Sequence, residues 1–179
     1  VTDTNGCAGT ASIDINESVP VTPEICIVTV DSITGSNLIV WDKQIGLNID
    51  YFNIYREGTQ SGIYFLVGSR PFGLESYFVD SFANPVIRSW RYRLSAVDSC
   101  GQESQMSGIH KTMHLTINVG LTGETNLIWD DYSGIQWQSF IIESGPDDTS
   151  LTLLTIVSSN VHAYVDLSPP AGTQVYRVS

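Results

Sequence analysis

Short apolar segments recur along the whole chain, and polar or turn residues separate almost every pair of them. Within each segment apolar residues alternate with a period of two, as in Asp50–Glu57 and Trp90–Asp98. That period is typical of half-buried β-strands, whereas the 3.6-residue repeat of an amphipathic helix is not sustained in any window. The pattern therefore predicts an all-β protein with essentially no helix.

The alternation predicts seven strands in the first half of the chain and six in the second. The seven are Cys26–Ser32, Asn37–Trp41, Asp50–Glu57, Tyr64–Ser69, Ser76–Asp80, Trp90–Asp98 and Ile109–Thr112. The six are Met113–Val119, Asn126–Trp129, Gln138–Ser144, Leu151–Val157, Ala163–Asp166 and Thr173–Ser179. Seven short strands separated by turns are typical of a two-layer β-sandwich.

These strand-like segments are similar in pairs about 88 residues apart. The repeated landmarks are Trp41 and Trp129, Phe52 and Phe140, and, with an offset of 84, Tyr92-Arg93-Leu94-Ser95 and Tyr176-Arg177-Val178-Ser179. A repeat of this length exceeds the roughly 20–50-residue period of solenoid proteins and matches the size of an autonomous domain. We therefore expect two domains in tandem, over 25–112 and 113–179.

Parity along each strand predicts which side chains face the core, because residues i and i+2 lie on one side of a sheet. In the first copy the inward residues are Val28, Val30, Ile39, Trp41, Phe52, Ile54, Tyr92, Leu94 and Ala96. In the second copy they are Met113, Leu115, Ile117, Leu127, Trp129, Phe140, Ile142, Tyr176 and Val178. We expect truncation of either core tryptophan to cost about 3–5 kcal/mol by leaving a cavity, enough to unfold a marginal domain.

The ordered set of landmark residues carries a family resemblance. In the first copy it comprises Trp41, Phe52-Asn53-Ile54-Tyr55-Arg56, and Tyr92, Leu94, Ala96 and Asp98 followed by Gly101 and Ser104. In the second copy it comprises Tyr164-Val165-Asp166-Leu167, Pro169-Pro170-Ala171-Gly172-Thr173 and Tyr176-Arg177-Val178-Ser179. Each set resembles a fibronectin type III domain, which implies two immunoglobulin-like β-sandwiches. The resemblance also implies that Tyr92 and Tyr176 form tyrosine corners, in which the hydroxyl bonds the preceding loop.

The two ends of the chain do not match whole domains. The second copy stops at Ser179, where its sixth strand should be running, so we expect its last strand to be missing and one sheet edge to be unpaired. Residues 1–24 look like the C-terminal hairpin of a preceding β-domain, with a turn at Asn5-Gly6, followed by a linker. We interpret the chain as a piece of a multidomain array, similar to those of large surface proteins of gliding bacteria exported by the type IX route. An alternative is that the N-terminal strand supplies the missing edge to a neighbour.

The three cysteines are Cys7, Cys26 and Cys100, so at least one lacks a partner within the chain. Cys26 shares the inward parity of Val28, and Cys100 shares that of Tyr92. In this fold the start of the first strand and the loop after the sixth lie at one pole, which predicts a disulfide between Cys26 and Cys100. The alternative is two buried free thiols. A disulfide would place the protein outside the cytoplasm, and Cys7 would have lost its partner with the preceding domain.

Composition narrows the classes of partner. Only 15% of the residues are charged, and the formal net charge is −11 with a pI near 4.3. A phosphate backbone requires clustered Lys and Arg, so we do not expect nucleic acid as a partner. No apolar run reaches the ~18 residues of a membrane span, so we expect no membrane insertion. Strands rich in hydroxyl and β-branched residues favour an extracellular all-β protein.

Few residues suggest chemistry of their own. His110 and His114 are four apart, but at a strand junction both are expected on the solvated side, so we expect no metal site. Asp130-Asp131 and Asp147-Asp148 are paired carboxylates in predicted turns, where Asp bonds the local backbone. A calcium loop needs further oxygen ligands that the sequence does not supply. We therefore expect no catalytic residues, no metal and no cofactor.

Trp90 and Trp137 are the candidate ligand contacts, because an aromatic plane outside the core can hold a sugar ring or an apolar partner. Trp90 shares the phase of Tyr92 and is also a candidate core residue. Arg91 and Arg93 are expected on the outward face of their strand as solvated positions.

The leading functional hypothesis is a non-catalytic extracellular spacer or adhesion module of a larger cell-surface protein. Its expected partners are neighbouring domains of the same polypeptide and protein or glycan at the cell surface. The alternative is a carbohydrate-binding module that presents exposed aromatic side chains. A glycosidase that uses Asp130 or Asp131 is the third hypothesis. Because Ile109–Thr112 runs almost directly into Met113–Val119, we also expect little hinge motion and an elongated shape.

Overall fold

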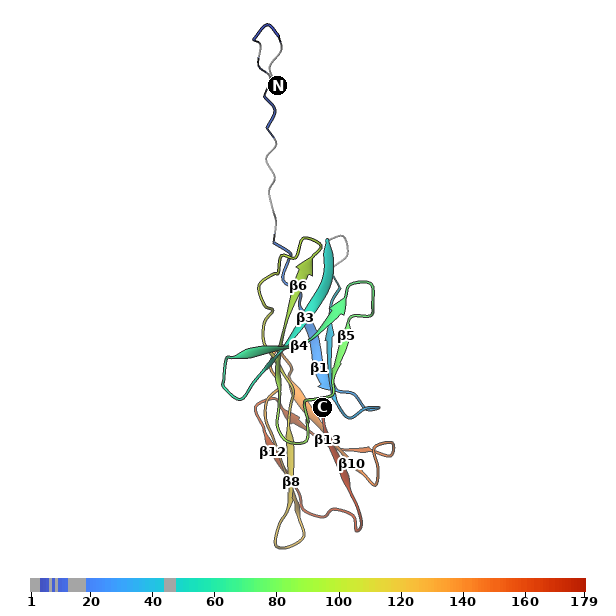
Figure 1. The fold of residues 1–179 in the computed structure, drawn as a ribbon. Coiled ribbons are helices and arrows are strands. Elements are labelled where there is room, and N and C mark those ends of the chain that lie inside the picture. Colours follow the sequence, from blue (N-terminus) through green and yellow to red (C-terminus); the bar gives the residue numbers. More distant parts are fainter. Residues whose placement is uncertain (1–3, 7, 9, 13–18, 44–47) are drawn as a thin grey trace.

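The computed structural model describes residues 4–6, 8, 10–12, 19–43 and 48–179. Within these residues every regular element is a strand, and the thirteen strands form four antiparallel sheets. Figure 1 shows the sheets stacked as two units that lie end to end, with the C-terminus close to the place where the units meet. The predicted fold class, an all-β tandem of two sandwiches, is confirmed.

The first sandwich contains residues 25–111. One sheet has the order β1 (Ile25–Val30), β2 (Asn37–Trp41) and β5 (Tyr77–Asp80). The other has the order β4 (Tyr64–Pro71), β3 (Ile49–Glu57), β6 (Arg91–Asp98) and β7 (His110–Lys111). Alternate residues of both sheets fill the space between them, as the parity of β2 predicts.

The second sandwich contains residues 115–178. One sheet has the order β12 (Ala163–Asp166), β9 (Thr125–Trp129) and β8 (Leu115–Val119). The other has the order β11 (Thr152–Ser158), β10 (Ser139–Gly145) and β13 (Val175–Val178). Ser179 extends the last pairing, because its backbone exchanges two hydrogen bonds with Ile141. Among the described strands none pairs with the other edge of β13.

The two cores are built around the same pair of rings. Trp41 is 2% exposed and its ring centroid lies 5.4 Å from that of Phe52, while Trp129 is 3% exposed and lies 5.6 Å from Phe140. Tilted or edge-on contacts of this kind add about 0.5–1.5 kcal/mol to the burial of the rings themselves. The internal repeat therefore reproduces a core contact as well as a strand order.

The two repeated tyrosines also make equivalent hydrogen bonds. The Tyr92 hydroxyl donates to Asp80 at 3.0 Å, and the Tyr176 hydroxyl donates to Asp166 at 2.9 Å. Asp80 is the last residue of β5 and Asp166 is the last residue of β12. In each case the tyrosine lies on the next strand along the chain. Asn37 donates to the Tyr92 hydroxyl at 2.9 Å. Burial raises the pKa of Tyr92, and the charge of Asp80 raises it further, so this phenol stays protonated.

The predicted disulfide is wrong, because Cys26 and Cys100 are both free and exposed. A register shift in the pairing of β1 with β2, between Ile25 and Ile27, interrupts the alternation. Ile25 and Val28 therefore face the core, while Cys26 points outward and Val30 is exposed. Parity also predicts that Ile117 faces the core, and this prediction is wrong, because Ile117 is 45% exposed on β8.

The N-terminal predictions fall mostly outside the described residues. Cys7 and most residues of the hairpin expected over 1–15 are not among the residues that the structure describes. Residues 4–6 do form a turn, in which Gly6 has φ 84°. A positive φ of this kind is accessible to Gly at little cost, which agrees with the predicted Asn5-Gly6 turn. No helix in the described part of the chain is long and apolar enough to cross a membrane.

Candidate functional site at the joint between the two sandwiches

Three consecutive polar residues at the end of the first sandwich are buried. His110, Lys111 and Thr112 are 7%, 9% and 2% exposed. Lys is almost never buried without a partner, because removal of its charge from water is costly. The loop 130–134 of the second sandwich covers this strand, and we call the contact between them the joint.

Backbone hydrogen bonds form the centre of the joint. The Lys111 amide donates to the Ser133 carbonyl at 2.9 Å, and the Ser133 amide donates to the Lys111 carbonyl at 3.2 Å. β7 is the edge strand of its sheet, so this pair closes an edge that would otherwise be open. The two sandwiches are thus joined by strand-type pairing as well as by the covalent chain.

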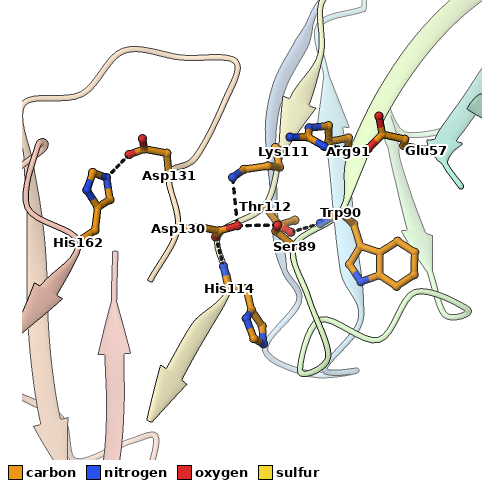
Figure 2. A network of polar contacts seen from close by, with 10 residues as sticks. All are labelled: Glu57, Ser89, Trp90, Arg91, Lys111, Thr112, His114, Asp130, Asp131 and His162. Carbon is orange, nitrogen blue, oxygen red and sulfur yellow. Dashed lines mark hydrogen bonds and ion pairs between the residues drawn. The ribbon is translucent and has the colours of Figure 1, made fainter. Parts of the chain in front are cut away.

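Asp130 collects three donors at the joint, as Figure 2 shows. Its Oδ2 accepts from the Ser89 hydroxyl at 2.6 Å and from the Lys111 ammonium at 3.1 Å, and its Oδ1 accepts from the His114 amide at 2.7 Å. Burial alone raises the pKa of Asp130, but these donors outweigh burial and hold the pKa below its ordinary value. This carboxylate of the second sandwich therefore bonds to the first sandwich and to the three-residue connection between the two.

Tyr132 ties the joint to the opposite sheet of the first sandwich. Its hydroxyl accepts from the Val28 amide at 2.8 Å and lies 3.0 Å from Nδ1 of His110. Because a phenol oxygen can both donate and accept, this contact ties the buried imidazole to the hydroxyl in either tautomer. Burial raises the pKa of Tyr132 and lowers that of His110, so both groups remain uncharged near pH 7.

Aromatic rings continue from the joint into the second core. His110 and Tyr132 meet edge to face with centroids 6.0 Å apart, and Tyr132 meets Trp137 in the same way at 6.0 Å. Trp137 then contacts Phe140 at 5.7 Å, which is in the second core. A displacement of the joint would therefore disturb the packing of the second sandwich.

Trp90, one candidate ligand contact, is half-buried beside the joint. Its backbone amide donates to the Thr112 hydroxyl at 2.9 Å (Figure 2). The guanidinium groups of Arg88 and Arg56 lie over its ring, at 3.9 and 5.0 Å from the ring centroid. The indole NH donates to the Asn84 carbonyl at 2.9 Å. The Trp90 ring is therefore already engaged by groups of the protein, and Trp137 is likewise half-buried against the second core.

The residues that suggested catalysis or a metal site have other partners. His110 is buried in the joint, which corrects the expectation of a solvated side chain, whereas Nε2 of His114 lies 2.8 Å from the Val86 carbonyl. Asp131 pairs with His162 (Figure 2), and Asp147 binds Thr149 of its own turn. Within the described residues no three His, Cys, Asp or Glu side chains gather as metal ligands.

Sequence reasoning missed the residues that make the joint. Tyr132, Ser133 and Gly134 were not singled out, and Asp130 was assigned to a turn. The available signals were the cation Lys111 on the short strand His110–Lys111 and a glycine directly after a tyrosine and a serine. Neither signal identifies Asp130, 19 residues away, as the partner, because the contact lies between copies of the repeat.

Comparisons with known proteins return sandwich folds at low similarity. No protein-family model and no curated protein matches the chain. An Fn3-like protein from Clostridium thermocellum shares 18% identity over 56% of this chain and 99% of that one, with a TM-score of 0.44. The chicken CNTN1 FN1-FN3 domains share 13% sequence identity over 89% of this chain and 60% of that one, with a TM-score of 0.43. The chicken interferon gamma receptor alpha chain shares 11% identity over 90% of this chain and 91% of that one, with a TM-score of 0.39. No function is transferred from these proteins.

Proposed function

We propose that this chain is a non-catalytic spacer that holds two β-sandwiches in one fixed relative orientation within a larger surface protein. The observation that supports this proposal is the joint, where Lys111 is buried and bonded by its backbone to Ser133 and by its ammonium to Asp130. If the two sandwiches moved independently, this strand edge would be exposed to solvent. Separation of the sandwiches would break these hydrogen bonds together and expose the ring contacts of Tyr132 with His110 and Trp137 to water, which favours the joined orientation.

The extracellular location and the adhesive part of the role belong to the same proposal. They are supported by the fibronectin type III resemblance of both copies and by the strand-rich composition, and not by a disulfide. Export by the type IX route is an expectation from the same resemblance. The carbohydrate-binding alternative is less favoured, because two arginines lie over the Trp90 ring and Trp137 packs against the second core.

Rotational diffusion tests the spacer proposal directly. In ¹⁵N relaxation measurements on the whole chain, we expect amides of β3 and β10 to report one common correlation time. The double variant Asp130→Ala, Tyr132→Ala removes the carboxylate and the phenol of the joint, so the two sandwiches should then show separate and shorter correlation times. The control Asp147→Ala alters an exposed turn of the second sandwich and should tumble like the original chain. Independent tumbling of the unmodified protein would refute the proposal.

A further inference from the structure

One cation of this chain has no anionic or carbonyl partner among the residues that the structure describes. The other seven Lys and Arg side chains each bond a carboxylate or a backbone carbonyl; they are Lys43, Arg56, Arg70, Arg88, Arg91, Lys111 and Arg177. Within the described residues Arg93, on β6, makes neither kind of bond. The chain has 19 acidic residues and only eight cations, so a cation that lacks both kinds of partner is unexpected.

The geometry around Arg93 explains why its charge is available. The guanidinium carbon lies 5.1 Å from the centre of the Tyr64 ring, which holds the side chain in one place. Its Nε is buried and has no hydrogen-bond acceptor within the described residues. The buried Nε is closed to a ligand as well, so the positive charge of Arg93 is left without an anion in the described part of the protein. Arginine binds carboxylates in a planar, two-pronged geometry, so a carboxylate is the group that fits.

Arg93 lines an open hollow on the outer face of the four-stranded sheet. The hollow has a volume of about 350 Å³ and is lined by Gly62, Ile63, Tyr64, Arg93, Met106 and Ile109. Three of these side chains are aliphatic or thioether groups, and all three are exposed. One positive group surrounded by exposed apolar side chains is typical of a site that binds a charged group attached to an apolar one.

The local charge also permits an anionic ligand. Residues 25–112 carry seven of the eight cations and only eight of the 19 carboxylates. The net negative charge of the chain is therefore concentrated elsewhere, on the N-terminal segment and the second sandwich. An approaching anion would meet a nearly neutral first sandwich with Arg93 at its surface.

We propose that this hollow binds an acidic residue of an extended peptide of a partner protein. The peptide carboxylate binds Arg93, and apolar residues two positions before and after it, which lie on the same side of an extended chain, contact Ile63, Met106 and Ile109. A peptide fits better than a sugar acid, because the ring face that a sugar would stack on, that of Tyr64, is taken by Arg93. Tyr64 also begins β4, the edge strand of the sheet, next to which an extended chain can lie. This binding role goes beyond that of a spacer.

A titration with a defined peptide tests the proposal. The probe is acetyl-Val-Ser-Asp-Ser-Val-amide, whose Asp and two Val side chains share one side of an extended chain. It is added to the ¹⁵N-labelled whole chain, and the matched peptide has Asn in place of Asp. We expect chemical-shift changes at residues 62–64, 93, 106 and 109 with the acidic peptide, and affinity at least about tenfold weaker for the Asn peptide. Arg93→Gln should weaken binding by a similar factor. Arg70→Gln removes a cation elsewhere on the same sandwich and should leave binding unchanged.

A second variant covers the case in which Arg93→Gln perturbs the fold. Met106→Glu places a carboxylate on the exposed wall of the hollow, where it competes with the peptide for Arg93. This variant should lose peptide binding while its spectrum remains that of a folded protein. The proposal is overturned by equal binding of the Asp and Asn peptides, by shift changes elsewhere on the protein, or by the absence of shift changes. Binding of free glucuronate as tight as that of the peptide would overturn the choice of a peptide.

Discussion

At Gly134 the joint leaves no room for a side chain. The residue has φ 123°, and a Cβ built on its backbone would lie 2.3–2.5 Å from three ring atoms of His110. His110 cannot retreat easily, because the ring is buried and its Nδ1 is hydrogen-bonded to Tyr132. The glycine is therefore required twice, once for its backbone conformation and once for the close approach of the two sandwiches.

We expect Gly134→Ala to destabilise the protein by more than backbone strain alone. The matched control is Gly123→Ala, whose φ is 94° and whose added Cβ would meet no atom within 4 Å. Positive φ costs about 1–2 kcal/mol at either position, and overpacking against His110 adds about 1–3 kcal/mol at Gly134 only. Urea unfolding of both variants measures the difference. Equal losses of stability would show that the His110 ring moves freely.

β7 is the element whose burial makes the joint sensitive to pH. His110 is buried there beside the Tyr132 hydroxyl, and burial lowers its pKa. As pH falls below the ordinary value of about 6.5, the unfolded chain takes up a proton at this histidine before the folded chain does. Stability contributed by His110 is therefore full above that pH and declines as pH falls through it.

Comparison with His110→Gln isolates this effect, because all other titrating groups are shared. We expect the difference in free energy of unfolding between the two proteins to be larger at pH 7.5 than at pH 5.5. Asp130 acts in a separate, more acidic window, since its hydrogen-bond donors and Lys111 hold its pKa below the ordinary value of an aspartate. The measurement is urea unfolding at the two pH values. A difference that stays constant or grows on acidification would contradict the assigned protonation state.

The elements also show which parts of the molecule could be predicted from the sequence. The strands Asn37–Trp41 and Ala163–Asp166 have the predicted bounds, because local alternation and flanking turn residues determine them. Parity failed at Cys26, where the bulge in β1 moves one residue out of phase. The burial of Lys111 could not be predicted, because its partner Asp130 belongs to the other copy and resembles an ordinary turn residue.

At the scale of the whole molecule, the two sandwiches differ in how well they are filled. Among the described residues the first core has ten buried hydrophobic residues and the second has five. A smaller core leaves a smaller excess of burial over chain entropy, so the second sandwich should be the weaker unit. The ring contacts from His110 through Tyr132 and Trp137 to Phe140 connect this weaker core to the stronger one. The joint should therefore stabilise the second sandwich as well as orient it.

We expect calorimetry of the whole chain to show one unfolding transition, because the joint couples the two cores. Tyr132→Ala removes the central ring and should weaken that coupling by about 3 kcal/mol, the low end for truncation of an aromatic residue. The variant should then show two transitions, of which the earlier belongs to the second sandwich. Phe82→Ala truncates an exposed aromatic residue in the first sandwich and should keep the single transition. Two transitions in the unmodified chain would mean that the joint fixes the orientation of the sandwiches without coupling their unfolding. Hydrogen bonds such as the one from the Val28 amide to Tyr132 can fix geometry in this way, because each adds little net free energy.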